Sequence, residues 1–263
     1  ALSYMIFTLS LGNYDTFLPL VADRGSRGAL SGSAWGIGYL GGIVALGAVY
    51  PILSHAVLPD DVGSFKMAFW ITCGIYVSFS IPAFFLMRKV KGGPARNPAS
   101  AWLPSDIASR VFATLRGWRA NREFFKTLIS YYLANDGLAT LMYFTSIYAA
   151  TTLGFDSKQI LLLFLLVQVV GVPSSIVGGI LADRVGHRRV LYFSLGLWTI
   201  LCVAFAVSNG ITQFYMLSVG TGIVIGTTPA VFRSLLSEFV DASRTAELFG
   251  FNSFASRASS VAG

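Results

Sequence analysis

Eight long apolar runs constrain this chain more than any other feature of its sequence. A membrane-spanning helix needs about 20 consecutive apolar residues, and runs of that order recur along nearly the whole chain. They cover residues 2–22, 33–54, 67–87, 127–150, 159–182, 190–208, 212–236 and 246–263. Each run is continuous, without the alternation of polar and apolar residues that marks the strands of a β-barrel. The sequence therefore predicts an all-α, polytopic membrane helical bundle with eight spans.

The composition excludes the main soluble classes. Charged residues make up 12% of the chain and hydrophobic residues 54%, whereas a soluble domain carries about 25% charged residues. That leaves too little polar surface to cover a soluble globule of this size. A disulfide scaffold is excluded as well, because the two cysteines, Cys73 and Cys202, lie isolated inside apolar runs.

The sequence also lacks the patterns of an enzyme. It contains no Walker phosphate loop, so direct use of ATP is not expected. The two histidines, His55 and His187, are expected on opposite sides of the membrane. Neither a metal centre nor a Ser-His-Asp site fits that arrangement. We expect no enzyme activity, no cofactor and no metal.

The basic residues orient the chain. Of the 19 lysines and arginines, sixteen lie in or next to odd-numbered loops, two lie in even-numbered loops, and Arg257 lies within the last run. Because Lys and Arg favour the cytoplasmic side, the odd loops are predicted to be cytoplasmic and the first span to start on the opposite side. The net charge of +7 is then explained by anionic membrane lipids as partners, without nucleic acid.

One long polar connection, residues 88–126, separates three spans in residues 1–87 from five in residues 127–263. Its first part is rich in Gly, Pro and basic residues, as in a flexible linker. From Ser105 onward, apolar residues at helical spacing predict a basic amphipathic helix on the membrane surface; a solvated connector is the alternative. Both ends of the chain fall inside apolar runs, so we expect it to be the middle of a longer protein.

Three charged residues lie inside apolar runs. They are Asp15, Asp136 and Arg257, and Asn13 and Asn135 stand close to the two acids. A charge at the bilayer centre costs at least ~2.5 kcal/mol unless it is paired or hydrated. We therefore expect the three charges, with Asn13 and Asn135 beside the acids, to face a shared watery cavity. There Asp136 and Arg257 would bind a polar solute or exchange a proton. A structural Asp–Arg pair that locks two helices together is the alternative.

The turn after the fifth run carries the densest motif. It reads Gly179-Ile180-Leu181-Ala182-Asp183-Arg184-Val185-Gly186-His187-Arg188-Arg189. Gly179 would let two helices approach closely, and Gly186 would permit a positive φ. Arg184, Arg188 and Arg189 are expected to hold the turn at the lipid headgroups. We expect Asp183 to act in a cytoplasmic gate by engaging Arg233 and the N-terminus of the eighth span.

This motif resembles the G-x-L-x-D-R-x-G-R-R/K loop of the major facilitator superfamily of secondary transporters, with His187 where an Arg is usual. Further stretches resemble, within that superfamily, the autophagy-associated vacuolar amino-acid effluxers and their bacterial relatives. These stretches are residues 13–19, 31–42, 131–137 and 249–260. In the first of them, Asp15-Thr16 replaces the usual Asn-Ala.

The resemblance implies a twelve-span fold of which these eight spans are the fourth to eleventh. It implies that the first, fourth and seventh spans here line a central cavity, and that residues 88–126 join two six-helix halves. The activity it implies is transport of a small polar solute such as an amino acid by alternating access, with proton coupling through a membrane carboxylate. Through its matching stretch, Tyr131 joins the candidate cavity residues. The alternative is a non-transporting scaffold or receptor on the same fold.

The same resemblance places the protein in the plasma (inner) membrane if it is bacterial and in the vacuolar membrane if it is eukaryotic.

Small residues recur at four-residue spacing in two runs. The pairs Gly32/Gly36 and Gly38/Gly42 lie in the second run, and Ser218, Gly222 and Gly226 lie in the seventh. Such ridges predict close helix packing. They fit static contacts and, alternatively, surfaces that slide during a transport cycle.

Overall fold

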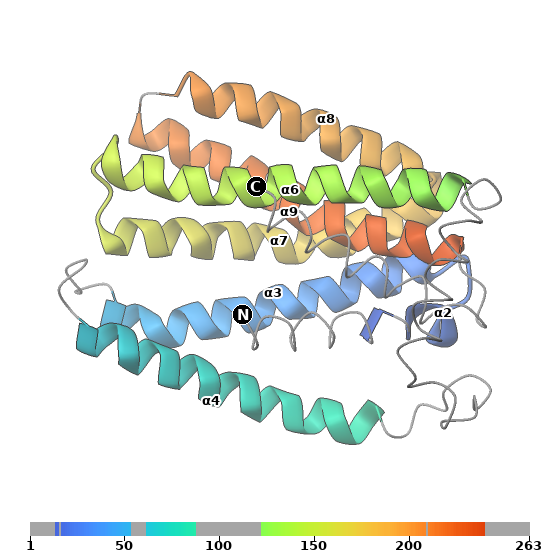
Figure 1. Cartoon of the computed structure of the whole chain (residues 1–263), viewed down its shortest axis with the longest axis horizontal. Coiled ribbons are helices and arrows are strands. Elements are labelled where there is room, and N and C mark those ends of the chain that lie inside the picture. Colours follow the sequence, from blue (N-terminus) through green and yellow to red (C-terminus); the bar gives the residue numbers. More distant parts are fainter. Residues whose placement is uncertain (1–13, 16, 54–61, 88–121, 209, 240–263) are drawn as a thin grey trace, which may run out of the picture. The chain divides into compact units, whose positions relative to one another are not determined.

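The regular structure of the described residues is entirely helical. A computed structural model of the chain describes residues 14, 15, 17–53, 62–87, 122–208 and 210–239. Within these ranges the helices are α2 (Leu18–Val21), α3 (Arg27–Leu53), α4 (Val62–Met87), α6 (Arg122–Thr151), α7 (Ser157–Val185), α8 (His187–Ala206) and α9 (Ile211–Glu238) (Figure 1). The predicted all-α class is confirmed.

Six of the eight predicted spans coincide with long helices. Among the described residues, α3, α4, α7, α8 and α9 are long and apolar enough to cross a membrane. Helix α6 has 30 residues and is more polar, because its first turns carry Glu123 and Lys126 and its middle carries Asp136. The first predicted run is represented only by its last residues, and the predicted amphipathic helix and eighth span lie outside the described residues.

The turn between α7 and α8 forms as the sequence predicts. Gly186 has a φ of 101°, a conformation that L side chains rarely adopt, and its N–H donates to the Ala182 carbonyl to end α7. At the other end of α7, Asp156 and Gln159 form a reciprocal capping box, with distances of 2.7 and 2.9 Å. Helix α7 is therefore fixed at both ends by local chemistry.

The chain divides into two compact units. One contains residues 1–27, 92–137 and 232–263, and the other contains residues 28–91 and 138–231. The described core of the first unit is formed by Phe124, Leu128 and Leu236. This division follows packing, and the predicted grouping of three spans, a linker and five spans stays a prediction.

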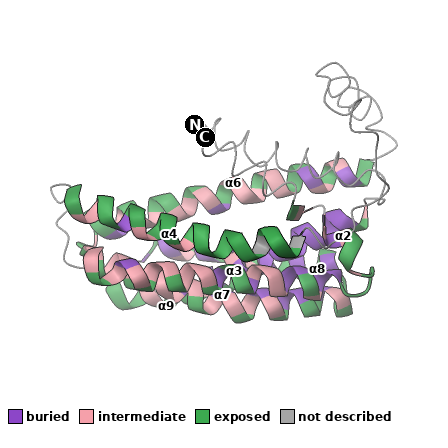
Figure 2. Cartoon of the chain, turned by 90° about the horizontal axis from the view of Figure 1, so that it is seen from below, coloured by how far each residue is buried: buried purple, intermediate pink, exposed green. Residues whose placement is uncertain are grey.

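The second unit, residues 28–91 and 138–231, has its core around α9. Val224, Ala230 and Val231 of α9 are fully buried. The glycines predicted to form a ridge on α9 face α7: a Cβ on Gly222 would meet Val170, and one on Gly226 would meet Gly171 and Ser174. Helix α4, in contrast, is exposed along nearly its whole length (Figure 2), with Ala68 its one buried residue among those described.

Candidate functional site

The carboxylate of Asp183 caps the N-terminus of α3. Its two oxygens accept hydrogen bonds from the backbone N–H groups of Gly28, at 2.8 Å, and Ala29, at 2.7 Å. These N–H groups belong to the first turn of α3, where no intrahelical acceptor is available. The negative charge also interacts favourably with the positive end of the helix dipole. We call this contact between the C-terminal end of α7 and the N-terminal end of α3 the Asp183 clamp.

Glycines bring the two helices of the clamp into backbone contact. A Cβ on Gly28 would collide with the Gly179 carbonyl and would lie 2.6 Å from an Asp183 carboxylate oxygen. A Cβ on Gly32 would collide with the Ser175 carbonyl. Any side chain at these positions would push α3 away from α7 and lengthen the hydrogen bonds of the clamp. The sequence predicted close packing at Gly179 and Gly32, and the structure shows that they face each other.

His187 adds a second polar group to the clamp. Its Nε2 lies 3.6 Å from Asp183 Oδ1, and both side chains are almost completely buried. The three arginines of the same motif, Arg184, Arg188 and Arg189, are exposed.

Asp183 has a partner that the sequence did not predict. Its carboxylate binds the backbone of α3, while the expected contact with Arg233 and the N-terminus of the eighth span, which lies outside the described residues, stays a prediction. Arg233 pairs with Asp15: its Nε lies 2.7 Å from an Asp15 carboxylate oxygen. Its guanidinium also stands over the ring of Tyr14, 4.3 Å from the centroid. The sequence could not predict these pairings, because the two residues of each pair lie far apart along the chain.

Asp15 and Arg233 form a buried ion pair within the first unit. The Arg233 side chain is 7% exposed and the Asp15 side chain 19%. Each charge offsets the desolvation penalty that the other would carry alone. This pair is a contact of the kind that we raised above as the alternative for Asp136 and Arg257, and a cavity role for Asp15 stays a prediction.

The remaining predicted cavity residues are only partly described. Tyr131, Asn135 and Asp136 lie on α6 and are half-buried. The ring of Tyr131 packs against Phe232 at a centroid distance of 5.1 Å. Asn13 and Arg257 lie outside the described residues, so a cavity shared by Asp136 and Arg257 stays a prediction.

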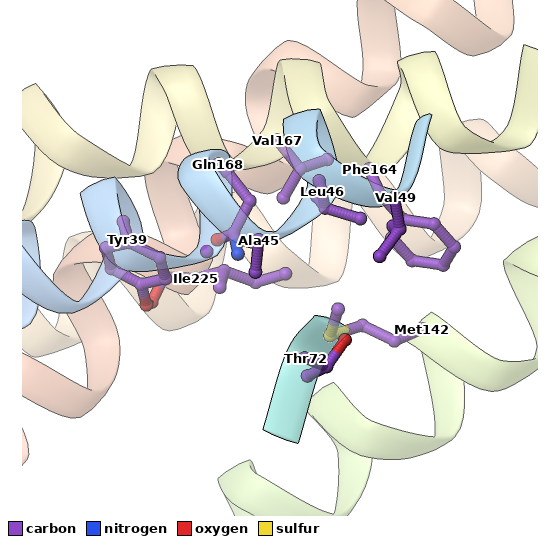
Figure 3. A pocket seen from close by; sticks show the side chains of 11 residues that line it. Tyr39, Ala45, Leu46, Val49, Thr72, Met142, Phe164, Val167, Gln168 and Ile225 are labelled. Atoms are coloured by element: carbon purple, nitrogen blue, oxygen red, sulfur yellow. The ribbon is translucent and has the colours of Figure 1, made fainter. Parts of the chain in front are cut away.

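The second unit contains a cavity whose lining differs from the predicted one, which was to come from the first, fourth and seventh spans. Its volume is about 410 Å³, and five residues of α3, three of α7 and one each of α4, α6 and α9 line it (Figure 3). Its polar side chains are Tyr39, Thr72 and Gln168, and the rest of the lining is apolar or glycine. Gln168 could have been noticed, since it is an isolated polar residue in the run Ile160–Val172.

The hydroxyl of Tyr39 is engaged by the backbone of α9. It donates to the Ile225 carbonyl at 2.6 Å, and the Tyr39 ring lies in van der Waals contact with the position of a Cβ on Gly171. The Thr72 hydroxyl donates to the Ala68 carbonyl of its own helix. Among the described residues, none hydrogen-bonds the Gln168 amide, which lies within the cavity (Figure 3).

The described residues form long apolar helices, with glycine contacts between backbones and an acid near the α7–α8 turn that caps α3. Together these features define an integral membrane protein with an all-α bundle of the major facilitator type. The chain belongs to the family described as "Vacuole effluxer Atg22 like", whose sequence profile matches residues 21–263. It is also 24% identical over 257 residues to the "Uncharacterized MFS-type transporter YxiO" of Bacillus subtilis (strain 168). That match covers 95% of this chain and 58% of the relative, so the chain spans less than two thirds of the relative's length.

Proposed function

We propose that the full-length protein is a secondary transporter that moves a small polar solute across a membrane by alternating access. The observation that carries this proposal is the cavity of about 410 Å³ between α3, α4, α6, α7 and α9. Helices α3 and α4 belong to the predicted N-terminal half and the other three to the predicted C-terminal half. A cavity between the two halves is the place where a solute reached alternately from either side would bind.

The Asp183 clamp and the cavity lie at different depths of the same helix pair. On α3 the cavity extends from Tyr39 to Val49, so its nearer edge lies about 16 Å from Gly28 at a rise of about 1.5 Å per residue. On α7, Gln168 precedes Asp183 by fifteen positions, which corresponds to about 22 Å. The clamp therefore holds one end of the pair together while the cavity lies toward the other end.

This arrangement supports a state that is closed at the predicted cytoplasmic face. Opening that face would separate α3 from α7 and break both hydrogen bonds to Asp183. Hydrogen bonds to a charged group contribute about 1.5–3 kcal/mol each. The clamp is thus strong enough to bias the conformational equilibrium and weak enough to be broken in each cycle.

Export is the expected direction, because the matched family is described as a vacuole effluxer. Amino acids are the first solutes to test, since the resemblance described above implies them. The test is a counterflow assay with the full-length protein in proteoliposomes, using a panel of radiolabelled amino acids with and without a pH gradient. We expect counterflow of at least one solute. Folded protein without counterflow of any solute would support the scaffold or receptor instead.

The proposed roles of the membrane charges need separate variants. Asp136→Asn and Arg257→Gln should each reduce uptake strongly if they bind solute or carry a proton. Full uptake by both variants at normal expression would overturn that role.

Water access to the cavity can be measured directly. The background is the full-length protein with every cysteine replaced by serine, Cys73 and Cys202 included. In this cysteine-free background, Ala45→Cys places a thiol on the cavity wall. We expect it to react with a charged, membrane-impermeant thiosulfonate added from the non-cytoplasmic side. The matched control is Val44→Cys, whose side chain does not line the cavity and is expected to stay unreactive. Equal, slow reaction at both positions would contradict an aqueous cavity.

A further inference from the structure

We propose that His187 makes the Asp183 clamp sensitive to pH, so that protonation of the imidazole favours opening at the predicted cytoplasmic face. This inference rests on the proposed function, since it assigns a regulator to that same movement. It begins with position. His187 is the first residue of α8 and follows Asp183 by four residues. Its Nε2 lies 3.6 Å from Asp183 Oδ1, the oxygen that also accepts the Gly28 N–H.

Burial makes the charge of His187 matter to the clamp. The His187 side chain is 7% exposed and the Asp183 side chain 9%, so salt and water screen their interaction much less than that of a surface pair. Among the side-chain types in this turn, histidine is the one whose charge changes between about pH 5 and pH 8. A proton on His187 would therefore place a cation directly beside the carboxylate that holds α3.

The other charged groups around the imidazole come from α7, α8 and α3. On α7 and α8 they are three exposed arginines: Arg184, Arg188 and Arg189. On α3 they are the backbone N–H groups of Gly28 and Ala29, which mark the positive end of that helix. The remaining charged side chains that the structure describes in this unit lie near the starts of α4 and α7, at the opposite predicted face: Lys66, Asp156 and Lys158.

The helix ends decide the direction of the effect. A helix N-terminus carries about half a positive charge. In the closed state, Asp183 caps the N-terminus of α3 and lies beside the N-terminus of α8, which begins at His187. These two ends together balance the single charge of the carboxylate. A proton on His187 therefore leaves a net positive charge in a buried site, which is costly.

The open state accommodates the same proton better. Separation of α3 from α7 removes the positive end of α3 and both hydrogen bonds of the clamp. His187 stays beside Asp183, because both belong to the α7–α8 turn, and its imidazolium supplies the positive charge that the carboxylate has lost. By linkage, a proton that is bound better in the open state shifts the equilibrium toward that state as the pH falls.

The reporter for opening is Ser31→Cys in the cysteine-free full-length protein, because Ser31 is completely buried on α3. Inside-out vesicles without solute are treated with a charged thiosulfonate at about pH 5.5 and about pH 8.0, on either side of the range in which histidine titrates. Thiols themselves react faster at high pH. Each rate is therefore divided by that of Lys126→Cys, an exposed position. We expect this ratio to be at least about fivefold higher at the lower pH.

Two substitutions fix the charge at position 187. His187→Gln stays neutral and should hold the ratio at the lower, high-pH value of the parent protein at both pH values. His187→Arg is a permanent cation and should hold the ratio at the higher, low-pH value. The matched control is His55→Gln, which removes the other histidine of the chain and should leave the pH response intact.

A merely structural histidine would leave the pH response in place when it is replaced. A response that persists in His187→Gln would therefore overturn the proposal, as would equal ratios in the Gln and Arg variants. A ratio that falls as the pH is lowered would overturn it as well, because the sign follows from the helix ends.

Asp183→Asn keeps the proposal testable if the His187 variants fold poorly. This substitution removes the carboxylate that the imidazolium pairs with, so the ratio should be high at both pH values and its pH response should be lost. A response of unchanged size would contradict the pairing. Because the vesicles contain no solute, a protein with the full pH response but without counterflow would contradict the transport proposal and not the role of His187. Counterflow together with a ratio that is independent of pH would contradict the role of His187 alone.

Discussion

A proline in α9 removes one backbone hydrogen bond, and a tyrosine of α3 replaces it. Pro229 lies inside α9 and has no N–H, so the carbonyl four residues earlier, that of Ile225, loses its helical partner. The Tyr39 hydroxyl donates to that carbonyl. Prolines are tolerated in membrane helices where neighbours satisfy the freed carbonyl, and this pair is such a case.

The first prediction concerns this pair. Tyr39→Phe should destabilise the protein by about 1–3 kcal/mol, because it leaves a partly buried carbonyl without a donor. In a Pro229→Ala background the same substitution should cost much less, since the N–H of the introduced alanine would restore the helical bond to Ile225. Thermal unfolding in detergent measures all four combinations. Equal losses in both backgrounds would show that Tyr39 acts only through its packing.

At the scale of elements, the face of α3 that meets α7 carries glycines where contact is closest. The sequence predicted the ridge pairs Gly32/Gly36 and Gly38/Gly42, and in the structure the two pairs have different surroundings. Gly32 and Gly36 pack against α7, whereas Gly38 has open space at its Cβ position. Only Gly32 and Gly36 therefore form a continuous ridge against α7, whereas Gly42 lines the cavity.

The second prediction uses this difference. Gly32→Ala should lower stability by about 1–3 kcal/mol, because a methyl group forced into packed backbone displaces the neighbouring helix. In a protein of this size that is a fall in melting temperature of roughly 5 °C. Gly38→Ala should be neutral or slightly stabilising, since alanine favours helix more than glycine does. A thermal shift assay that ranks the two variants the other way would contradict the packing described here.

The sequence predicted the elements better than their partners. A continuous apolar run crosses a bilayer as a helix, so six of the runs were recognised as helices, with bounds that agree to within six residues. The start of α3 was placed at residue 33, yet the helix begins at Arg27, because the acid that caps it, Asp183, is contributed by α7. Likewise, a single polar residue such as Gln168 shows no pattern along the chain. Gln168 faces Gly42 and lines the cavity only because the fold places α3 beside α7.

At the scale of the whole molecule, the Asp183 clamp should set the balance between conformations. The third prediction is that Asp183→Asn shifts this balance toward opening at the predicted cytoplasmic face, because it removes the charge that the α3 N-terminus attracts. A buried reporter, Ser31→Cys, should then react with a charged thiosulfonate about tenfold faster in inside-out vesicles, in the cysteine-free background.

The control for this variant is Asp156→Asn. Asp156 also caps a helix, but it caps the N-terminus of its own helix α7, at the end opposite to the clamp. The variant Asp156→Asn should leave the reactivity of the Ser31→Cys reporter unchanged. If both variants raised the rate equally, general loosening of α7 would explain the effect and the clamp would have no gating role.

A cross-link at the same level separates solute binding from transport. The Ser31 hydroxyl donates to the Ala230 carbonyl at 2.8 Å, so α3 and α9 also touch near the clamp. In the cysteine-free background, Ser31→Cys with Ala230→Cys, joined by a short bifunctional thiosulfonate, should hold these helices together and abolish counterflow. Equilibrium binding of the solute found by counterflow should persist, and a reductant should restore exchange.

The single-cysteine variants treated with the same reagent show whether modification alone inhibits. Alternating access requires the helices to separate at this face, so a protein that still exchanges solute while fully cross-linked would not work by the movement proposed here. Loss of both binding and exchange would show instead that the reagent distorts the cavity. Only the loss of exchange with retained binding fits a clamp that gates a solute site at a distance.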